Sequence, residues 1–122
     1  VTMSTLGNSA DFGDLLYTTS QSTGASNSVR GLYNGGISIN YITIATTGNA
    51  QDFGDLNTSS TYPTGAASPT RAVFHIGSAH PSVVNTIEYV QIMSTGNALD
   101  FGDLTQGRQM RSSACSNGHG GL

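Results

Sequence analysis

The amino-acid sequence places six of its seven acidic residues in three identical pairs. Each pair stands in a nine-residue segment that we call the DFGDL motif: GNSADFGDL from Gly7, GNAQDFGDL from Gly48 and GNALDFGDL from Gly96. The pairs are Asp11 and Asp14, Asp52 and Asp55, and Asp100 and Asp103. Neighbouring carboxylates bind metal ions, transfer protons or accept hydrogen bonds from main-chain amides. Because a catalytic site rarely occurs three times in one chain, the triplication favours a structural role.

The first structural role for these aspartates is to hold a tight corner of the main chain. An Asp side chain accepts hydrogen bonds from amides close by in the chain, and the glycine of each motif permits a positive φ or a close approach. The phenylalanine between the two aspartates is then expected to pack in the core between neighbouring units. These phenylalanines are Phe12, Phe53 and Phe101.

A second structural role pairs an aspartate with a basic residue. Sixteen residues after the second aspartate of each motif stand Arg30, Arg71 and, in the third copy, His119. A planar guanidinium bridges a carboxylate and nearby carbonyls, and so ties adjacent strands together. This alternative predicts ion pairs such as Asp55 with Arg71.

Calcium binding is the alternative that gives the motif a chemical function. Asn49, Asp52 and Asp55 offer oxygen ligands. However, Ca²⁺ takes about six to eight oxygens, and the spacing matches neither the EF-hand loop nor a calcium-binding nonapeptide. We therefore expect no metal and no cofactor.

The remaining reactive side chains do not form a catalytic pattern. His75 and His80 stand five residues apart, which on a strand places them on opposite faces, a poor geometry for a shared metal. Cys115 is the single cysteine, so an intrachain disulfide is excluded, and we expect it to be a small buried residue. The chain is therefore not expected to be an enzyme.

Composition excludes two classes of partner. Charged residues make up 9% of the chain, the net charge is −3 and lysine is absent, so no basic surface is available to neutralise phosphates. No apolar run approaches the length of a membrane span. Ser, Thr, Gly and Asn are abundant and lysine is absent, which suits an exposed protein outside a cell. We expect neither nucleic-acid binding nor a membrane span.

The spacing of the motif predicts repeated four-stranded units. Its copies start 41 and then 48 residues apart, and a period in the forties is typical of the blades of a β-propeller. Before each motif lies an alternating segment, such as NYITIATTG from Asn40, that is typical of a half-buried strand. A small-residue strand and an Arg-led strand ending in glycine precede it, and the motif is expected to form the corner between the alternating strand and an outer polar strand. No helical pattern occurs, so the sequence predicts an all-β fold.

These strands divide the chain into two complete units and two half-units. The predicted boundaries are 1–23 for a half-unit, 24–64 and 65–109 for complete units, and 110–122 for a second half-unit. If the two ends complete one another, about three four-stranded antiparallel units result, which is fewer than the roughly four to eight blades of a closed propeller. We therefore expect residues 1–122 to be one repeat domain within a larger propeller or assembly.

The strand ending in paired glycine, the later aromatic residue and the period resemble kelch-type β-propellers, although the Trp that is usual near the end of a kelch blade is absent. The segment NTIEYVQIMSTGNALDFGDLT and the ending CSNGHGGL look more specifically like repeat units of large virion structural proteins of marine tailed phages, above all cyanophages. The resemblance covers essentially the whole chain. It implies a repetitive protein of the virion or of an extracellular appendage, with no assigned chemistry.

The expected function is that of a structural and adhesion component of a phage tail fibre, virion appendage or extracellular filament. Its partners would be homo-oligomeric or filament neighbours and a glycan of a host surface. The first alternative is a lectin-like propeller with one sugar site per blade, for which Tyr33, Tyr62 and His80 stand in candidate ligand-facing loops. A copper enzyme of the galactose-oxidase type is the second alternative, and the lone Cys115 argues against it.

Overall fold

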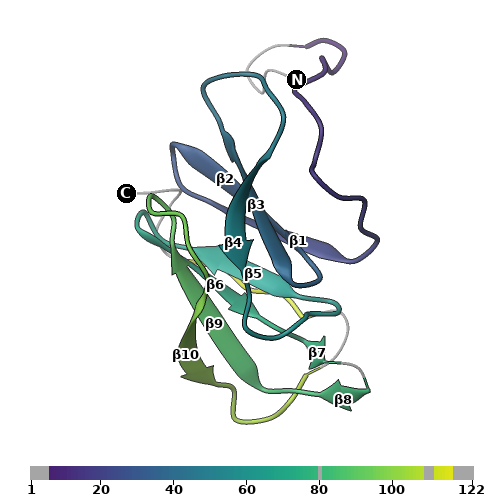
Figure 1. Cartoon of the computed structure of the whole chain (residues 1–122), viewed down its shortest axis with the longest axis vertical. Helices are drawn as coiled ribbons and strands as arrows, with labels where there is room; N and C mark the ends of the chain where they lie inside the picture. The colour runs from purple at the N-terminus through teal and green to yellow at the C-terminus, as the bar shows by residue number, and fades with distance from the viewer. Residues whose placement is uncertain (1–5, 80, 109–111, 117–122) are drawn as a thin grey trace.

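A computed structural model describes residues 6–79, 81–108 and 112–116 of the chain. These residues form two four-stranded antiparallel sheets and one two-stranded sheet, and they contain no helix (Figure 1). The all-β prediction is therefore confirmed. The sheets do not close into a ring in the described part of the chain. His80 and His119 lie outside the described residues.

The first sheet is a meander whose strands pair in chain order. Its strands are β1 (Ser22–Ser26), β2 (Arg30–Gly35), β3 (Ser38–Thr43) and β4 (Gln51–Asp55). Gly36, at φ 80°, makes the tight turn between β2 and β3 that the glycine-rich sequence at this point favours. The predicted small-residue, Arg-led and alternating segments are thus β1, β2 and β3.

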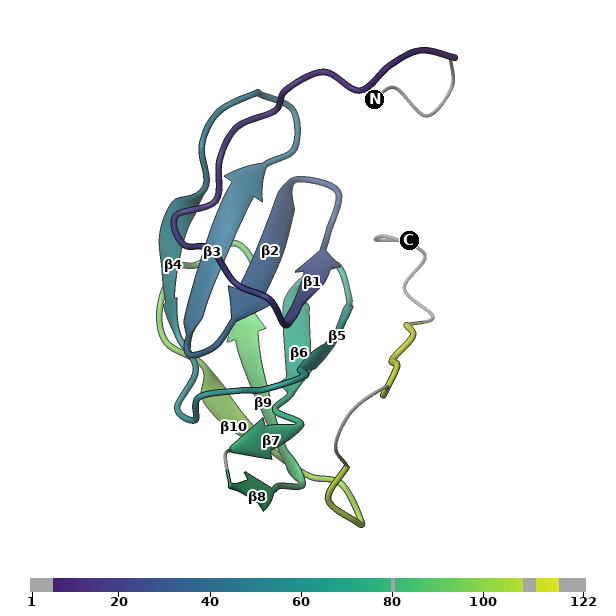
Figure 2. The same cartoon turned by 90° about the vertical axis from the view of Figure 1, so that its right-hand side faces the viewer.

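The second sheet repeats this arrangement with an insertion. Its strands are β5 (Thr64–Ala67), β6 (Arg71–His75), β9 (Thr86–Gln91) and β10 (Leu99–Asp103). Between β6 and β9 stands a separate hairpin of β7 (Ser78–Ala79) and β8 (Ser82–Val83). The longer spacing of 48 residues exceeds the shorter spacing of 41 by seven, and the hairpin accounts for these residues. It projects from the end of the second sheet (Figure 2).

The prediction that the DFGDL motif is a corner between two strands is wrong in one respect. Residues of the motif form the fourth strand itself, β4 in the first sheet and β10 in the second, and no outer polar strand follows them in the described chain. In both strands the register shifts at the phenylalanine, so that Phe53 and Phe101 are the extra residues of a β-bulge. A bulge bends the strand and redirects the side chain of the extra residue. A bulged strand therefore has a sequence that resembles that of a corner.

The core lies between the two stacked four-stranded sheets, which Figure 2 shows one behind the other. From the first sheet and the residue after β4 come Leu32, Ile39, Phe53 and Leu56; from the second unit come Ala72, Phe74, Ile76, Val90, Ile92 and Ala98. β1 lies beside β5, where the Gly65 amide donates to Thr23 Oγ1 at 3.0 Å. The repeated units are therefore joined into one packed body.

Residues 6–21 and 112–116, which fall mainly in the two predicted half-units, flank this body without forming strands. The segment from residue 6 to β1 runs along the first sheet and crosses to its far edge (Figure 2). Residues 112–116 lie near β5, where the Thr64 and Ser112 hydroxyls are 2.7 Å apart. Among the described elements there is no helix long and apolar enough to cross a membrane.

Candidate functional site

The second and third copies of the motif are joined by three hydrogen bonds. The amides of Gly96 and Ala98 donate to the carbonyls of Phe53 and Asp55, each at 2.8 Å. The Asp55 amide in turn donates to Asn97 Oδ1 at 3.1 Å. The Asn97 side chain thus takes the place of a main-chain carbonyl, and the Gly-Asn start of one motif extends the outer edge of the preceding β4.

The first and second copies are joined in the same way. Gly48 and Ala50 donate their amides to the carbonyls of Phe12 and Asp14 at 2.8 Å. The Asp14 amide donates to Asn49 Oδ1 at 3.0 Å. Since the same groups meet at nearly the same distances twice, the DFGDL motif is a joint between consecutive units. We call these contacts the motif joint.

The joint explains why the motif contains glycine at its centre. Gly13 and Gly54 both have φ of 144°, a conformation that favours glycine. A Cβ at Gly13 would stand 2.2 Å from the Gly48 carbonyl oxygen, and one at Gly54 would stand 2.4 Å from that of Gly96. The sequence predicted either a positive φ or a close approach here. Both occur at each joint, and Gly54 also lies within β4.

The third motif has the same conformation but no following unit in the described chain. Gly102 has φ of 135°, yet a Cβ built there meets nothing within 4 Å. The exposed fraction of the phenylalanine side chain is 2% for Phe53, 36% for Phe12 and 54% for Phe101. The predicted core position is confirmed for Phe53 and is wrong for Phe12 and Phe101. No sheet covers β10 on the side of Phe101 in the described chain.

The aspartates take part in the local structure of the motif. Asp11 Oδ1 accepts from the Gly13 amide at 3.2 Å, and Asp100 Oδ1 accepts from the Gly102 amide at 3.1 Å. These are the local bonds expected of an Asp side chain. The described residues contain no group of three or more His, Cys, Asp or Glu that could hold a metal ion. The candidate calcium ligand Asn49 already accepts the Asp14 amide through its Oδ1.

The predicted ion pair between motif aspartate and arginine is replaced by stacking on tyrosine. The Arg30 guanidinium lies 4.5 Å from the centre of the Tyr41 ring, and that of Arg71 lies 5.2 Å from the Tyr89 ring. Arg30 also donates through Nη1 to the Ile92 carbonyl of the second unit at 3.0 Å. No ion pair joins these arginines to aspartates in the described chain. Arg30 and Arg71 stand opposite Thr43 and Gln91, and each guanidinium lies over the tyrosine ring two positions along the neighbouring strand.

Each tyrosine also contacts the phenylalanine of its own unit. The rings of Tyr41 and Phe53 meet edge to face with centroids 5.9 Å apart, and Tyr89 and Phe101 repeat the contact at the same separation. Arginine, tyrosine and phenylalanine thus form a column on one face of each sheet. These two contacts of the tyrosines were not predicted from the sequence, although Tyr41 and Tyr89 both stand seven residues before the first glycine of a motif.

A second missed residue is Glu88, the acidic residue outside the motifs. It is 1% exposed, and its Oε2 accepts from the Asn57 amide at 2.8 Å, directly after the second motif. Asn57 Nδ2 in turn donates to the Ala98 carbonyl at 3.0 Å. Asn40 holds the equivalent position in the first sheet, where its buried Oδ1 has no hydrogen-bond partner among the described residues. No sequence pattern marked Glu88 as a buried acceptor, because it stands alone in a strand and belongs to no motif.

The candidate ligand-binding tyrosines do not lie in equivalent loops. Tyr33 lies within β2, so its predicted loop position is wrong, and its hydroxyl is 2.8 Å from Thr19 Oγ1. Tyr62 stands between β4 and β5 with φ of 59°, where its carbonyl crowds Gly77. Cys115 is exposed, contrary to expectation, because residues 112–116 have no further strand packed over them in the described chain.

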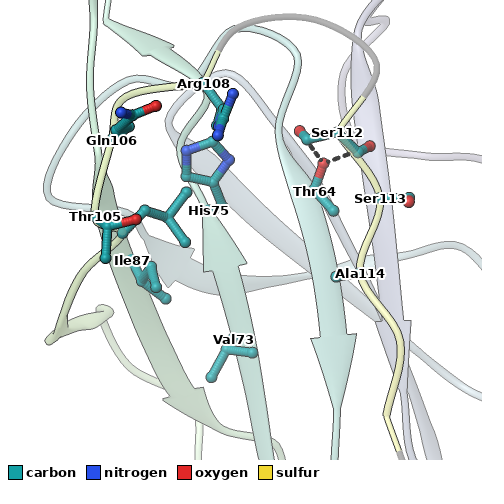
Figure 3. Close-up of a pocket in the computed structure, with 11 residues that line it drawn as sticks. Thr64, Val73, His75, Ile87, Thr105, Gln106, Arg108, Ser112, Ser113 and Ala114 are labelled. Atoms are coloured by element: carbon teal, nitrogen blue, oxygen red, sulfur yellow. Dashed lines mark hydrogen bonds between the residues drawn. The ribbon is translucent and has the colours of Figure 1, made fainter.

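The open face of the second sheet carries a hollow of about 400 Å³ (Figure 3). Val73, Ile87 and Leu104 form its apolar part, and Figure 3 shows His75 and Arg108 on the side where residues 105–108 pass. The His75 side chain is 8% exposed, and its Nδ1 has no hydrogen-bond partner in the described structure. Comparison of the chain with protein-family models, with curated proteins and with solved structures gave no match.

Proposed function

We propose that the chain is a non-catalytic structural and adhesion component of a phage tail fibre, virion appendage or other extracellular filament, built of kelch-like blades. The observation that carries this proposal is the motif joint, which links consecutive units twice through the same main-chain and asparagine groups. A joint made from repeated sequence is a device for building length, because each added unit supplies the next attachment point.

The chemistry of the repeated residues supports a structural role. The aspartates of the second and third motifs belong to the edge strands β4 and β10, and Asp11 and Asp100 bond to amides of their own motif. The central glycines of the first two motifs are required by close approach of the next unit. These residues serve the contact between units, which accounts for their repetition without a reaction.

Adhesion is assigned to the segments that differ between units. The β7–β8 hairpin is present in the second unit and has no equivalent in the first. It projects away from the packed sheets (Figure 2), so its sequence can change at little cost to the core. A hairpin on a rigid repeat is a suitable element for contacting a glycan or protein of a host surface.

Immunogold electron microscopy tests this proposal. Antibodies raised against the purified chain are expected to label fibres or appendages on intact particles or cell surfaces. Labelling confined to the interior of cells would contradict it.

The lectin-like alternative is tested on a glycan array. The adhesion proposal predicts that deletion of the β7–β8 hairpin removes any binding that the array detects, whereas Tyr33→Ala and Tyr62→Ala leave it unchanged. Loss of binding in the tyrosine variants, with the hairpin variant unaffected, would favour the lectin-like alternative.

A further inference from the structure

Two different faces meet in the core between the sheets. The first sheet contributes the face that carries Leu32 and Phe53, which we call the motif face. The second sheet contributes the face that carries Phe74 and Val90, which we call the receiving face. Because the two faces differ, one contact between units leaves a motif face at one end of the stack and a receiving face at the other.

The free motif face is on the second sheet. The residues equivalent to Leu32 and Phe53 are Val73 and Phe101, which stand 41 and 48 positions later. Leu32 and Phe53 are 3% and 2% exposed, whereas Val73 lines the hollow of Figure 3 and Phe101 is 54% exposed. Phe101 and Val73 line a second hollow that Cys115 and Ser116 border. The residues equivalent to the buried pair of the first sheet thus stand on a face that residues 112–116 cross and that leaves Phe101 exposed.

The outer edge of β10 is free as well. At β4 the equivalent edge receives the Gly-Asn-Ala segment that starts at Gly96. No Gly-Asn segment lies against Phe101, Gly102 or Asp103 in the described chain, and the space beside Gly102 is open. The Phe101 carbonyl, the Asp103 carbonyl and the Asp103 amide, which are equivalent to the three groups of the joint at β4, therefore have no Gly-Asn segment beside them in the described chain.

The matching partner is present at the other end of the chain. Gly7, Asn8 and Ser9 stand at the positions that Gly48, Asn49 and Ala50 hold in the second motif. Residues 6–10 are exposed, whereas Ala50 is 4% exposed within its joint. The chain thus carries one unused half of the joint at each end.

We propose that the open third motif of one copy docks the Gly7-Asn8-Ser9 segment of a second copy and forms a third motif joint between chains. The proposal is continuous with the joint already formed twice within the chain. The Gly7 and Ser9 amides donate to the carbonyls of Phe101 and Asp103, and the Asp103 amide donates to Asn8 Oδ1. The occupant is a second copy of this chain because it supplies the same Gly-Asn start followed by a small residue.

Assembly through this joint is head to tail. The joined faces differ, so the second copy again presents an open third motif and the association continues until the stack ends or closes into a ring. The inference deepens the proposed structural function and rests on it for the role of the motif as a connector. It does not depend on adhesion.

Sedimentation velocity over a range of concentrations tests the proposal with two blocked variants. Gly102→Val places a branched side chain where the carbonyl of Gly7 is expected to pass, since the equivalent Cβ positions lie 2.2 and 2.4 Å from a carbonyl oxygen. Gly36→Val is the matched control, because Gly36 also has a positive φ and open space but lies away from the joint. The double variant Gly7→Pro with Ser9→Pro removes both amide donors from an exposed segment.

The expected result is that the average mass of the natural chain rises with concentration above the 12.6 kDa of the monomer. Each blocked variant should associate at least about tenfold more weakly, while Gly36→Val associates as the natural chain does. A mixture of the two blocked variants should form 1:1 dimers and nothing longer, because each retains one working half. Circular dichroism confirms that each variant is folded.

Three outcomes would overturn the inference: a natural chain that stays monomeric, blocked variants that associate normally, or a mixture of blocked variants that fails to dimerise. Failure of adhesion is a separate result. If the chain assembles but antibodies against it label no fibre, the proposed function is contradicted and the inferred joint between chains stands. If the antibodies label fibres but the purified chain stays monomeric, only the inferred joint between chains is contradicted.

Discussion

The second and third DFGDL motifs share their main-chain geometry and differ in what covers them. In both, the phenylalanine is the extra residue of a bulge and meets a tyrosine at 5.9 Å. The second motif is packed between two sheets and bonded to the start of the third, whereas the third stands at an open edge. The local conformation is thus a property of the motif, and burial is a property of the neighbouring unit.

The comparison of the motifs shows what the glycine shared by all three copies is needed for. The glycine at the centre of the motif has positive φ in all three copies, but it lies against a neighbouring main chain in two. Its conformation is needed for the bulge, and its lack of a side chain is needed for the joint. Substitutions at paired positions separate the two requirements, because each pair changes the same residue with and without a covering unit.

The largest difference is expected for the phenylalanines. Phe53→Ala removes a 2% exposed side chain from the core and should lower the free energy of unfolding by about 3–5 kcal/mol. Phe101→Ala removes a side chain that is 54% exposed and should cost less than about 1 kcal/mol in the monomer. Urea unfolding followed by circular dichroism measures both. Equal losses would mean that the two motifs are equally covered in solution.

The central glycines should differ by about 1–3 kcal/mol, the usual cost of forcing extra atoms into a packed region. Gly54→Ala and Gly102→Ala both strain a residue of positive φ, so the shared backbone term cancels between them. Only Gly54→Ala drives a Cβ against the Gly96 carbonyl. Thermal unfolding of the two variants side by side measures the difference. If Gly102→Ala is the more damaging of the two, the joint at Gly54 does not form as described.

The arginines of the two units are expected to differ by a smaller free energy of unfolding. Arg30→Ala should cost about 1–3 kcal/mol, because the guanidinium is partly buried and donates to the Ile92 carbonyl across the two units. Arg71→Ala removes an exposed stacking contact with Tyr89 and should cost about 0.5–1 kcal/mol. Chemical denaturation provides both values. A loss at Arg71 as large as that at Arg30 would show that the bond to Ile92 contributes little.

The smallest effect is expected for the asparagines of the joint. Asn97→Ala deletes the acceptor of the Asp55 amide and should cost about 0.5–1.5 kcal/mol, with faster hydrogen exchange at that amide. Asn8→Ala, at a concentration where the chain is monomeric, should leave both stability and exchange unchanged. Exchange measured by NMR distinguishes the two positions. Unchanged exchange at Asp55 in the Asn97 variant would remove this asparagine from the joint.

Local pattern was sufficient to predict the first three strands of each four-stranded sheet. The alternation in NYITIATTG and the period of the motif identified β3 and its equivalent β9, and the seven additional residues of the longer spacing are accounted for by the β7–β8 hairpin. The motif itself was harder to interpret, because a bulged strand and a tight corner both need glycine beside aspartate. The sequence therefore indicated special backbone geometry at Gly54 without indicating that it lies in a strand.

The partners of side chains were predicted less well than the strands. Arg71 was expected to meet an aspartate because opposite charges attract, but the neighbouring strand presents the Tyr89 ring to it instead. Cys115 was expected to be buried because its neighbours in sequence are small, and it is exposed because nothing covers its segment in the described chain. Contacts between strands depend on register, which a one-dimensional spacing of sixteen residues does not contain.

Periodicity in the sequence was enough to predict an all-β, repetitive chain, and the triplication predicted a structural role for the three motifs. Strand periodicity and backbone conformation are local, so they follow from neighbouring residues. Only the tertiary structure decided that the motif joins one unit to the next and that Phe53 is covered while Phe101 is open. The hydrogen bonds of the two joints link residues 35 to 43 positions apart in the chain. Similar segments gain different surroundings when one has a following unit and the other does not.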